Sequence, residues 1–317
     1  DVGGEVQDRP YVEMRKEKVG VRALHHHDGE VGVCLEFFRE GSVVRDVILC
    51  ADLGTGSLRV GAITTKGTVV ATACAAFRTA RTEPGWSVID PEAWWRALAR
   101  TVGRTLDQLA KGTRVQGLCL SGLTRSQVVL DRDGRPLAPA LLFRDHRAVD
   151  EAAEVARHFP AANPADGITA FHPLARIACF ARRQPETFDR IGAVLEPKDF
   201  LNFRLSGAIA ADSVTYSRYD HTRATPGALP DWLERCRGLL ALRRIAPWHV
   251  LGRMTNRQSP FDRLAGIPVF AGAMDAWATA VGSGAIRAGQ GYDIAGTSEV
   301  AGLITPARAV VPGLVSL

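Results

Sequence analysis

The sequence predicts an α/β domain with a mixed sheet flanked by helices, followed by the start of a second, similar domain. Short apolar runs joined by glycine-containing turns occupy residues 47–76. A segment with helical periodicity at 91–110 then leads to another apolar run at 116–122. Strand-like and helix-like segments that alternate in this way are typical of α/β folds. After residue 145 the pattern becomes mostly helical, so we expect these helices to flank the sheet.

The first three runs predict an antiparallel meander, because they are rich in β-branched residues and separated by turn signals such as Lys66-Gly67. A helix is expected to begin at Pro91, with Asp90 as its N-cap. Apolar side chains recur at every fourth position along it, at Trp94, Leu98, Val102 and Leu106. A meander, a crossover helix and a parallel fourth strand together predict a ribonuclease H-like domain.

Length and composition indicate an ordinary globular protein. The chain has 317 residues, of which 46% are hydrophobic and 23% are charged. Its length leaves room for about two domains, and its composition excludes a disordered, collagenous or coiled-coil protein. No run approaches the ~18 apolar residues of a membrane span, and the first twenty residues contain no apolar stretch like the h-region of a signal peptide. The six cysteines contain no C-x-x-C pair, so we expect free thiols, a cytoplasmic location and no membrane partner.

The net charge is +5, with 39 basic and 34 acidic residues. A basic balance can indicate nucleic-acid binding, but here the arginines are scattered and no basic patch is interleaved with aromatic residues. We therefore expect no nucleic-acid partner. A solvated surface is one explanation of the charge, and an anionic small-molecule partner is the other.

A glycine-rich turn follows the first apolar run. In the segment Asp52-Leu53-Gly54-Thr55-Gly56-Ser57-Leu58-Arg59, successive backbone N–H groups and two hydroxyls would form an anion site. Asp52 at the strand end is suited to Mg²⁺, which prefers carboxylate and water oxygens. The alternative is an ordinary tight hairpin.

Two motifs near the C-terminus also indicate chemistry. Gly296-Thr297-Ser298 lies in a second strand–turn–strand segment, and two such turns facing each other could hold the phosphates of a nucleotide. Asp275 follows a strand and a glycine turn and opens a helix of small residues. It is either a simple helix N-cap or a general base that accepts a proton from a substrate hydroxyl.

Polar residues also follow the strands of the central region. Thr124-Arg125 and Asp145-His146-Arg147 each come after a strand end, where open α/β sheets bind ligands. A hydroxylated substrate needs hydrogen-bond donors and acceptors, and arginine with aspartate supplies both. The alternative is a surface ion pair worth less than ~1 kcal/mol.

Taken in order, these motifs resemble the FGGY family of carbohydrate kinases, and the similarity to its xylulokinase-like members runs from about Val47 onward. The segments that carry the resemblance are DLGTGSLR, GWSVIDPEAWW, LSGLTRSQVVLDRDGRPLAPALLFRDHRA, EPKDFLNFRLSG, and PVFAGAMDAWATAVGSGAIRAG with DIAGTSEV. It implies an actin-like ATPase fold and phosphorylation of a sugar or polyol hydroxyl by ATP with Mg²⁺.

The resemblance also assigns roles to residues. Asp275 would be the catalytic base, and Asp52 would position Mg²⁺ through water. Thr124, Arg125 and Asp145 would contact the sugar. The phosphates of ATP would bind the two turns, at Gly54, Thr55, Gly56, Ser57 and Arg59 and at Gly296, Thr297 and Ser298.

Some positions depart from the family pattern. Leu123-Thr124-Arg125 stand where xylulokinase-like members typically have Gln-Met-His, and Arg176 stands where a lysine is usual. The chain also ends shortly after the second turn, so we expect a truncated second domain that lacks most of the adenine site. The predicted division is an extension at 1–45, an N-terminal kinase domain at 46–265, and an incomplete C-terminal domain at 266–317. The alternative function is a non-catalytic sugar-binding or regulatory remnant. A homodimer is left open.

Overall fold

The computed structural model describes residues 20–25, 31–36, 46–160, 167–223, 227–295, 299–307, 311 and 314. The chain divides into two compact units, Asp1–Gly41 and Ser42–Leu317. In the first unit, strands β1 (Gly20–His25) and β2 (Val31–Glu36) pair in antiparallel fashion. All further description concerns the second unit.

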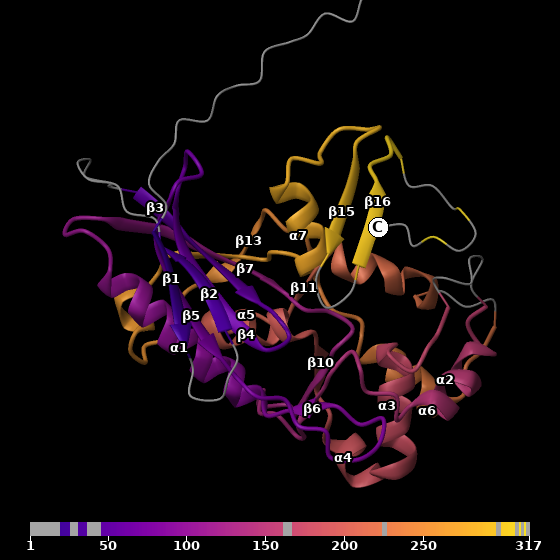
Figure 1. Cartoon of the computed structure of the whole chain (residues 1–317). Coiled ribbons are helices and arrows are strands. Elements are labelled where there is room, and N and C mark those ends of the chain that lie inside the picture. The colour runs from indigo at the N-terminus through magenta and orange to yellow at the C-terminus, as the bar shows by residue number, and fades with distance from the viewer. Residues whose placement is uncertain are drawn as a thin grey trace, which may run out of the picture. The chain divides into compact units, whose positions relative to one another are not determined.

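A six-stranded mixed sheet forms the centre of the second unit, in the order β13-β14-β7-β3-β4-β5 (Figure 1). Its strands are β3 (Asp46–Leu53), β4 (Ser57–Thr64), β5 (Val69–Ala76), β7 (Arg114–Gly122), β13 (Val250–Arg253) and β14 (Pro268–Phe270). The first three form the expected antiparallel meander. Strand β7 is parallel to β3, and β14 is parallel to β7. The predicted mixed sheet is therefore confirmed.

The helices of the unit are α1 (Pro91–Asp107), α2 (Val149–Ala156), α3 (Pro173–Arg183), α4 (Pro185–Arg190), α5 (Pro197–Ser206), α6 (Asp231–Gly238), α7 (Asp275–Gly282), and the 3₁₀ helices η2 (Thr215–Thr222) and η3 (Phe261–Leu264). Short strands pair outside the main sheet: β6 (Val88–Ile89) with β9 (Ala140–Leu141), β8 (Val128–Leu130) with β10 (Ala193–Leu195), β11 (Ala211–Asp212) with β12 (Arg244–Ile245), and β15 (Gly291–Ala295) with β16 (Glu299–Leu303). In the described part of the chain, no helix has the length and apolar character needed to cross a membrane.

Helices α1 and α5 cover one face of the sheet. Burial alternates along β3, and its inward side chains belong to the same apolar cluster as side chains from both helices. This cluster includes Leu49, Leu53, Trp94, Leu98 and Phe200. Asp90 caps α1 as expected, because its Oδ1 accepts a hydrogen bond of 3.0 Å from the N–H of Glu92. Local sequence signals thus fix where α1 begins and which face it buries.

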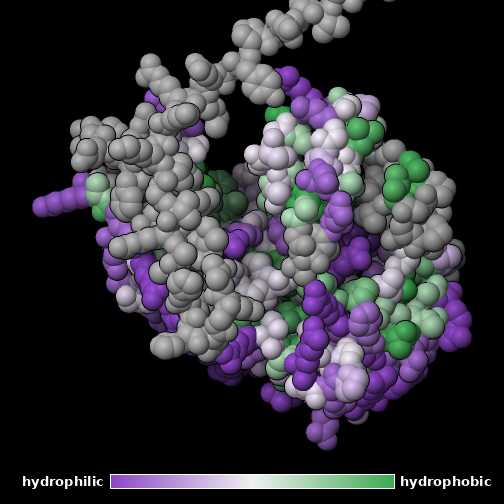
Figure 2. All heavy atoms as spheres, in the orientation of Figure 1, coloured by the Kyte–Doolittle hydropathy of each residue, from purple (hydrophilic) through white to green (hydrophobic). Residues whose placement is uncertain are grey.

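A second apolar cluster joins α3, α4 and α6 to the short strands β8 and β10. Its fully buried members include Leu174, Val194 and Leu233. These helices lie together on the side of the unit away from the β3–β5 meander (Figure 1). On the face drawn in Figure 2, hydrophilic side chains dominate this lower region and hydrophobic groups are small and scattered.

Gly272 allows the chain to turn from β14 into α7 directly against β7. Its φ is +64°, and a Cβ at this position would lie 1.8 Å from the carbonyl oxygen of Leu120. Its own N–H donates to the carbonyl of Pro247 at 2.9 Å. Only glycine fits this junction, which sets the first residue of α7 against the end of β7.

We predict that Gly272→Ala lowers the free energy of unfolding by about 3 kcal/mol or more, through left-handed strain and overpacking together. Gly67→Ala is the matched control, because Gly67 also has a positive φ, +82°, but a Cβ there meets no atom within 4 Å. The control should lose only about 1 kcal/mol. Urea denaturation followed by circular dichroism measures both changes, and equal losses would contradict the packing argument.

Candidate functional site

The carboxyl ends of β3 and β7 meet at one edge of the sheet. Leu53 and Gly122 are in register there, and the N–H of Leu123 donates to the carbonyl of Leu53 at 2.8 Å. An isolated parallel bridge joins Gly122 to Met274, the residue before α7. Three segments distant in sequence therefore converge where open α/β sheets usually bind ligands.

Asp52 and Asp275 come from two of these segments. Asp52 accepts a hydrogen bond of 3.3 Å from the Ser121 hydroxyl, and its Oδ2 lies 3.9 Å from Arg59. Met274, and not Asp275, is the N-cap of α7, so the simple capping interpretation of Asp275 is wrong. Asp275 is the first helical residue, and its Oδ1 accepts from the N–H of Ala276 at 2.8 Å.

The pKa of Asp275 is raised above its ordinary value. Burial is the largest cause, and the nearby charge of Asp52 raises the pKa further. The N–H of Ala276 and the guanidinium of Arg218 act in the opposite direction. A carboxylate with a raised pKa accepts protons more readily, which is the property a general base needs.

The loop after β7 carries Thr124 and Arg125. The Thr124 hydroxyl accepts a hydrogen bond of 2.5 Å from Nη2 of Arg218. Arg125 has a φ of 55°, and no other described residue except glycines has a positive φ. Its side chain is exposed. Such an unfavourable backbone conformation costs of order 1–3 kcal/mol and occurs preferentially at functional sites.

Asp145 is completely buried and already has partners. Its Oδ2 accepts from the N–H of Ser87 at 2.8 Å and from Nη2 of Arg147 at 2.7 Å, and its Oδ1 accepts from Nε of Arg147 at 2.8 Å. Burial opposes the charge, but the hydrogen bonds from Arg147 and Ser87 hold the pKa of Asp145 below its usual range. Arg147 in turn lies over the ring of Trp86 at 3.7 Å. These bonds are all internal to the chain, so contact between Asp145 and a sugar stays a prediction.

The predicted phosphate turn lies between β3 and β4, at the same edge of the sheet. The N–H of Gly54 bonds to the carbonyl of Ser57 at 2.9 Å, which closes the turn and leaves Thr55 and Gly56 exposed. Arg59 is also exposed and lies on β4 opposite Asp52. The second turn, Gly296-Thr297-Ser298, lies outside the described residues.

Arg176 on α3 joins two segments of the site, although sequence analysis marked it only as a departure from a family pattern. Its guanidinium donates to the carbonyls of Arg125 (2.9 Å), Leu142 (2.5 Å) and Asp145 (3.1 Å). It also contacts the Gln127 side chain. Burial lowers the pKa of Arg176 to about 10, so the side chain stays charged at neutral pH.

Sequence analysis also missed Arg218 and Glu196. Arg218 lies on η2 and contacts both Thr124 and the sulfur of Met274, at 2.5 and 3.3 Å. Glu196 is buried beneath the loop, where it accepts from the Tyr219 hydroxyl at 2.8 Å and from the N–H of Ser126 at 3.2 Å. The only signal for Glu196 was its place as the first residue of the segment EPKDFLNFRLSG, which carries part of the family resemblance.

Lys198 forms a buried ion cluster next to the end of β7. Its Nζ lies 2.5 Å from Asp199, 3.2 Å from Asp212 and 2.9 Å from the carbonyl of Ala271. One cation thus faces two buried carboxylates. Burial raises the pKa of Asp199 to about 7, against the opposing effect of Lys198.

The described residues contain no group of three or more histidine, cysteine, aspartate or glutamate side chains that could hold a metal ion by themselves. A half-exposed Asp52 still suits Mg²⁺, which keeps several water ligands and binds proteins through one or two carboxylates together with substrate phosphates.

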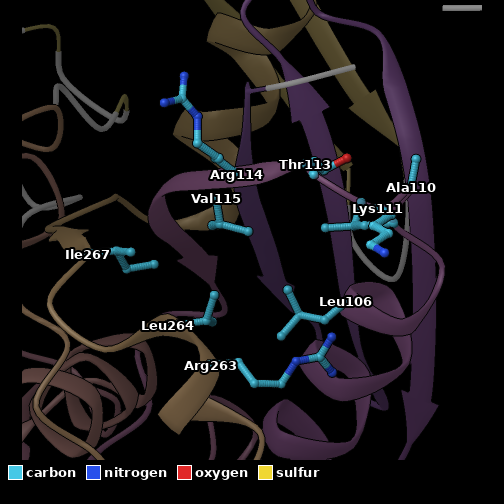
Figure 3. Close-up of a pocket in the computed structure, with 11 residues that line it drawn as sticks. Leu106, Ala110, Lys111, Thr113, Arg114, Val115, Arg263, Leu264 and Ile267 are labelled. Carbon is cyan, nitrogen blue, oxygen red and sulfur yellow. The ribbon is translucent and has the colours of Figure 1, made fainter. Parts of the chain in front are cut away.

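A pocket of about 390 Å³ lies at the opposite end of the sheet, near the first residues of β7 (Figure 3). Apolar side chains such as Leu106, Leu264 and Ile267 line it together with Lys111. Its two arginines are paired, Arg263 with Asp107 and Arg114 with Asp46. None of the candidate site residues at the carboxyl ends of β3 and β7 lines this pocket.

The fold defines an α/β domain of the ribonuclease H-like class, with a candidate binding site at the carboxyl ends of its parallel strands. A sequence model of the FGGY family of carbohydrate kinases, N-terminal domain, matches residues 47–282. The chain therefore belongs to the FGGY family of carbohydrate kinases, as the motifs suggested.

Similar proteins support this assignment. The chain is 30% identical over 257 residues to a xylulose kinase of Escherichia coli and 28% identical over 257 residues to one of Klebsiella pneumoniae. Each match covers 78% of this chain and 52% of the relative, so the chain spans about half the length of these relatives. The crystal structure of xylulose kinase from Rhodospirillum rubrum superposes with a TM-score of 0.68 at 25% identity, over 78% of this chain and 52% of that one.

We predict that the Lys198 cluster makes stability depend on pH. Because the pKa of Asp199 rises from 3.8 to about 7 on folding, the folded chain binds this proton more tightly than the unfolded chain. The stabilisation is fully present below pH 3.8 and is lost as the pH rises through about 7. Asp199→Asn keeps the shape but does not titrate, so its stability relative to the wild type should grow across this range.

Denaturation curves recorded at several pH values measure this difference. Asp133→Asn is the control, since Asp133 lies in an exposed turn with its side chain 70% accessible. If wild-type and Asp199→Asn stabilities run parallel with pH, the raised pKa of Asp199 is wrong.

Proposed function

We propose that this chain supplies the acceptor site and the catalytic base of an ATP-dependent carbohydrate kinase. The reaction transfers the γ-phosphoryl group of MgATP to a hydroxyl of a ketose or polyol, with a xylulose-like sugar as the acceptor. The observation that carries the proposal is Asp275, a half-buried carboxylate with a raised pKa at the edge where β3 and β7 end. The names of the xylulose kinase relatives support the acceptor class.

Asp275 accepts the proton of the acceptor hydroxyl as that oxygen attacks the γ-phosphorus. The bond from phosphorus to the β,γ-bridging oxygen breaks, and ADP leaves. Such assistance by a general base contributes about 10²–10⁴-fold to a rate. Arg218 and the N–H of Ala276 oppose the rise in the pKa of Asp275 and so favour its ionised form, the form that accepts the proton.

The turn between β3 and β4 meets the phosphates. Thr55 and Gly56 are exposed there, and Arg59 brings a positive charge from β4. Asp52 would hold Mg²⁺ through water, and the ion would supply positive charge next to the phosphate oxygens. The second turn, at Gly296-Thr297-Ser298, would act from the other side.

The acceptor binds beside the loop after β7. Thr124 and Arg125 offer a hydroxyl and a guanidinium, and Arg176 fixes the loop by holding the Arg125 carbonyl. Asp145 is turned inward toward Arg147, so its contact with the acceptor requires these hydrogen bonds to open on binding. A homodimeric assembly and a cytoplasmic location stay predictions.

We predict that Asp275→Asn abolishes most turnover but leaves acceptor binding intact. ADP release with a panel of ketoses and polyols should fall about 10²–10⁴-fold, because the amide cannot accept the proton. Asp107→Asn, at the exposed end of α1, is the matched control and should keep wild-type turnover.

Isothermal titration with the same acceptors separates binding from catalysis. Turnover by Asp275→Asn near the wild-type rate would refute the catalytic role. Acceptor binding by a wild-type chain that never releases ADP would instead support the sugar-binding remnant.

A further inference from the structure

The loop after β7, which carries Thr124 and Arg125, is called the acceptor loop from here on. Arg218 lies between this loop and the start of α7. Its Nη2 contacts the Thr124 hydroxyl at 2.5 Å and the Met274 sulfur at 3.3 Å, and its Nε donates to the carbonyl of Thr215 at 2.8 Å. It is also close enough to Asp275 for its charge to lower the pKa of that carboxyl. A single guanidinium therefore borders both the loop residue Thr124 and the proposed base.

The charge of Arg218 is not neutralised by a direct partner. Among the described residues, no carboxylate oxygen lies within 4.0 Å of its nitrogens, whereas Arg147, Arg204 and Arg244 all form ion pairs. Glu196 interacts with Arg218 electrostatically, but its two oxygens are occupied by the Tyr219 hydroxyl and the Ser126 N–H. Its hydrogen bonds to the described residues use Nε and Nη2, which leaves Nη1 for a ligand.

Arg125 carries a second guanidinium on the loop after β7. It follows Thr124 directly, it is exposed, and the charges of Arg218 and Arg125 both act on the Tyr219 hydroxyl. No ion pair of Arg125 occurs in the described residues either. The φ of 55° strains the backbone at Arg125, the residue whose side chain is exposed on this loop.

Two arginines that form no ion pair with the described residues border the proposed acceptor site. They indicate an anionic acceptor, since guanidinium groups bind carboxylates with charge-assisted, often bidentate hydrogen bonds. This inference rests on the proposed function and narrows its acceptor: we propose that the preferred acceptor is a polyhydroxy chain of the proposed size with a carboxylate at one end, a sugar acid, and that this carboxylate binds Arg218 and Arg125. Its reacting hydroxyl lies at the other end of the carbon chain, at Asp275. Repulsion between Asp275 and the carboxylate disfavours the reversed orientation.

Matched acceptor pairs test this inference by isothermal titration of the full chain. D-Xylonate is compared with xylitol, and D-gluconate with D-glucitol, so that each pair differs only in a carboxylate replacing a hydroxymethyl group. We expect the acid of each pair to bind about tenfold more tightly or better, which is the usual size of a charge-assisted hydrogen bond. The preference should weaken as salt is added.

Arg218→Gln should remove most of the preference, with a loss of about tenfold for the acids and little change for the polyols. Arg218→Lys should fall between the two. Arg125→Gly is a second variant that removes a guanidinium while relieving the positive φ, so the fold should tolerate it. Arg100→Gln, on the exposed side of α1, removes the same charge far from the loop and should leave both affinities unchanged.

Each outcome decides the question. If the polyols bind as tightly as the acids, the sugar-acid inference is wrong while the kinase proposal stands. If Arg218→Gln weakens acid and polyol equally, Arg218 is only structural and the inference is again wrong. If neither acids nor neutral ketoses and polyols bind, the acceptor site itself is wrong and both proposals fail together.

Discussion

The geometry at the edge where β3 and β7 end depends on one buried cation, Arg176. Helix α3 packs in the apolar cluster next to the short strands, and from there the guanidinium reaches the carbonyls of Arg125, Leu142 and Asp145. Loops leave carbonyl oxygens without partners from regular structure, and burying them unpaired would cost free energy. One side chain satisfies several of them, so the loop after β7 and the segment around Asp145 are held in a fixed relation.

The balance of charge around Asp275 depends on the position in which Arg176 holds the loop after β7. Burial and Asp52 raise its pKa, while Arg218 lowers it, and Arg218 is itself placed by the Thr124 hydroxyl and by the carbonyl of Thr215. A base must be ionised to accept a proton yet basic enough to do so at neutral pH. Burial and Asp52 make the carboxyl more basic, and Arg218 opposes them by favouring its ionised form.

Local patterns in the sequence were sufficient for the meander and for α1 with its cap at Asp90. They also placed Asp52 and Thr124 at strand ends and Asp275 at the start of a helix. Each of these depends on neighbouring residues. Long-range partners could not be predicted: Arg218 lies in a 3₁₀ segment without apolar periodicity, yet it contacts Thr124, 94 positions earlier. The burial of Asp145 was hidden for the same reason, because Trp86 and Ser87, which help enclose it, belong to a distant segment.

Burying charged side chains costs the domain free energy of folding. Desolvation of Lys198 with Asp199 and Asp212, or of Arg176, costs several kcal/mol per ion before any attraction is gained. Apolar side chains of similar volume would often give equal or greater stability. They would not, however, direct hydrogen bonds at the Ala271 carbonyl just before Gly272 and α7, or at the Arg125 carbonyl in the acceptor loop. The buried charges are found next to the segments that carry Asp275 and Thr124, which is where a fixed position matters more than stability.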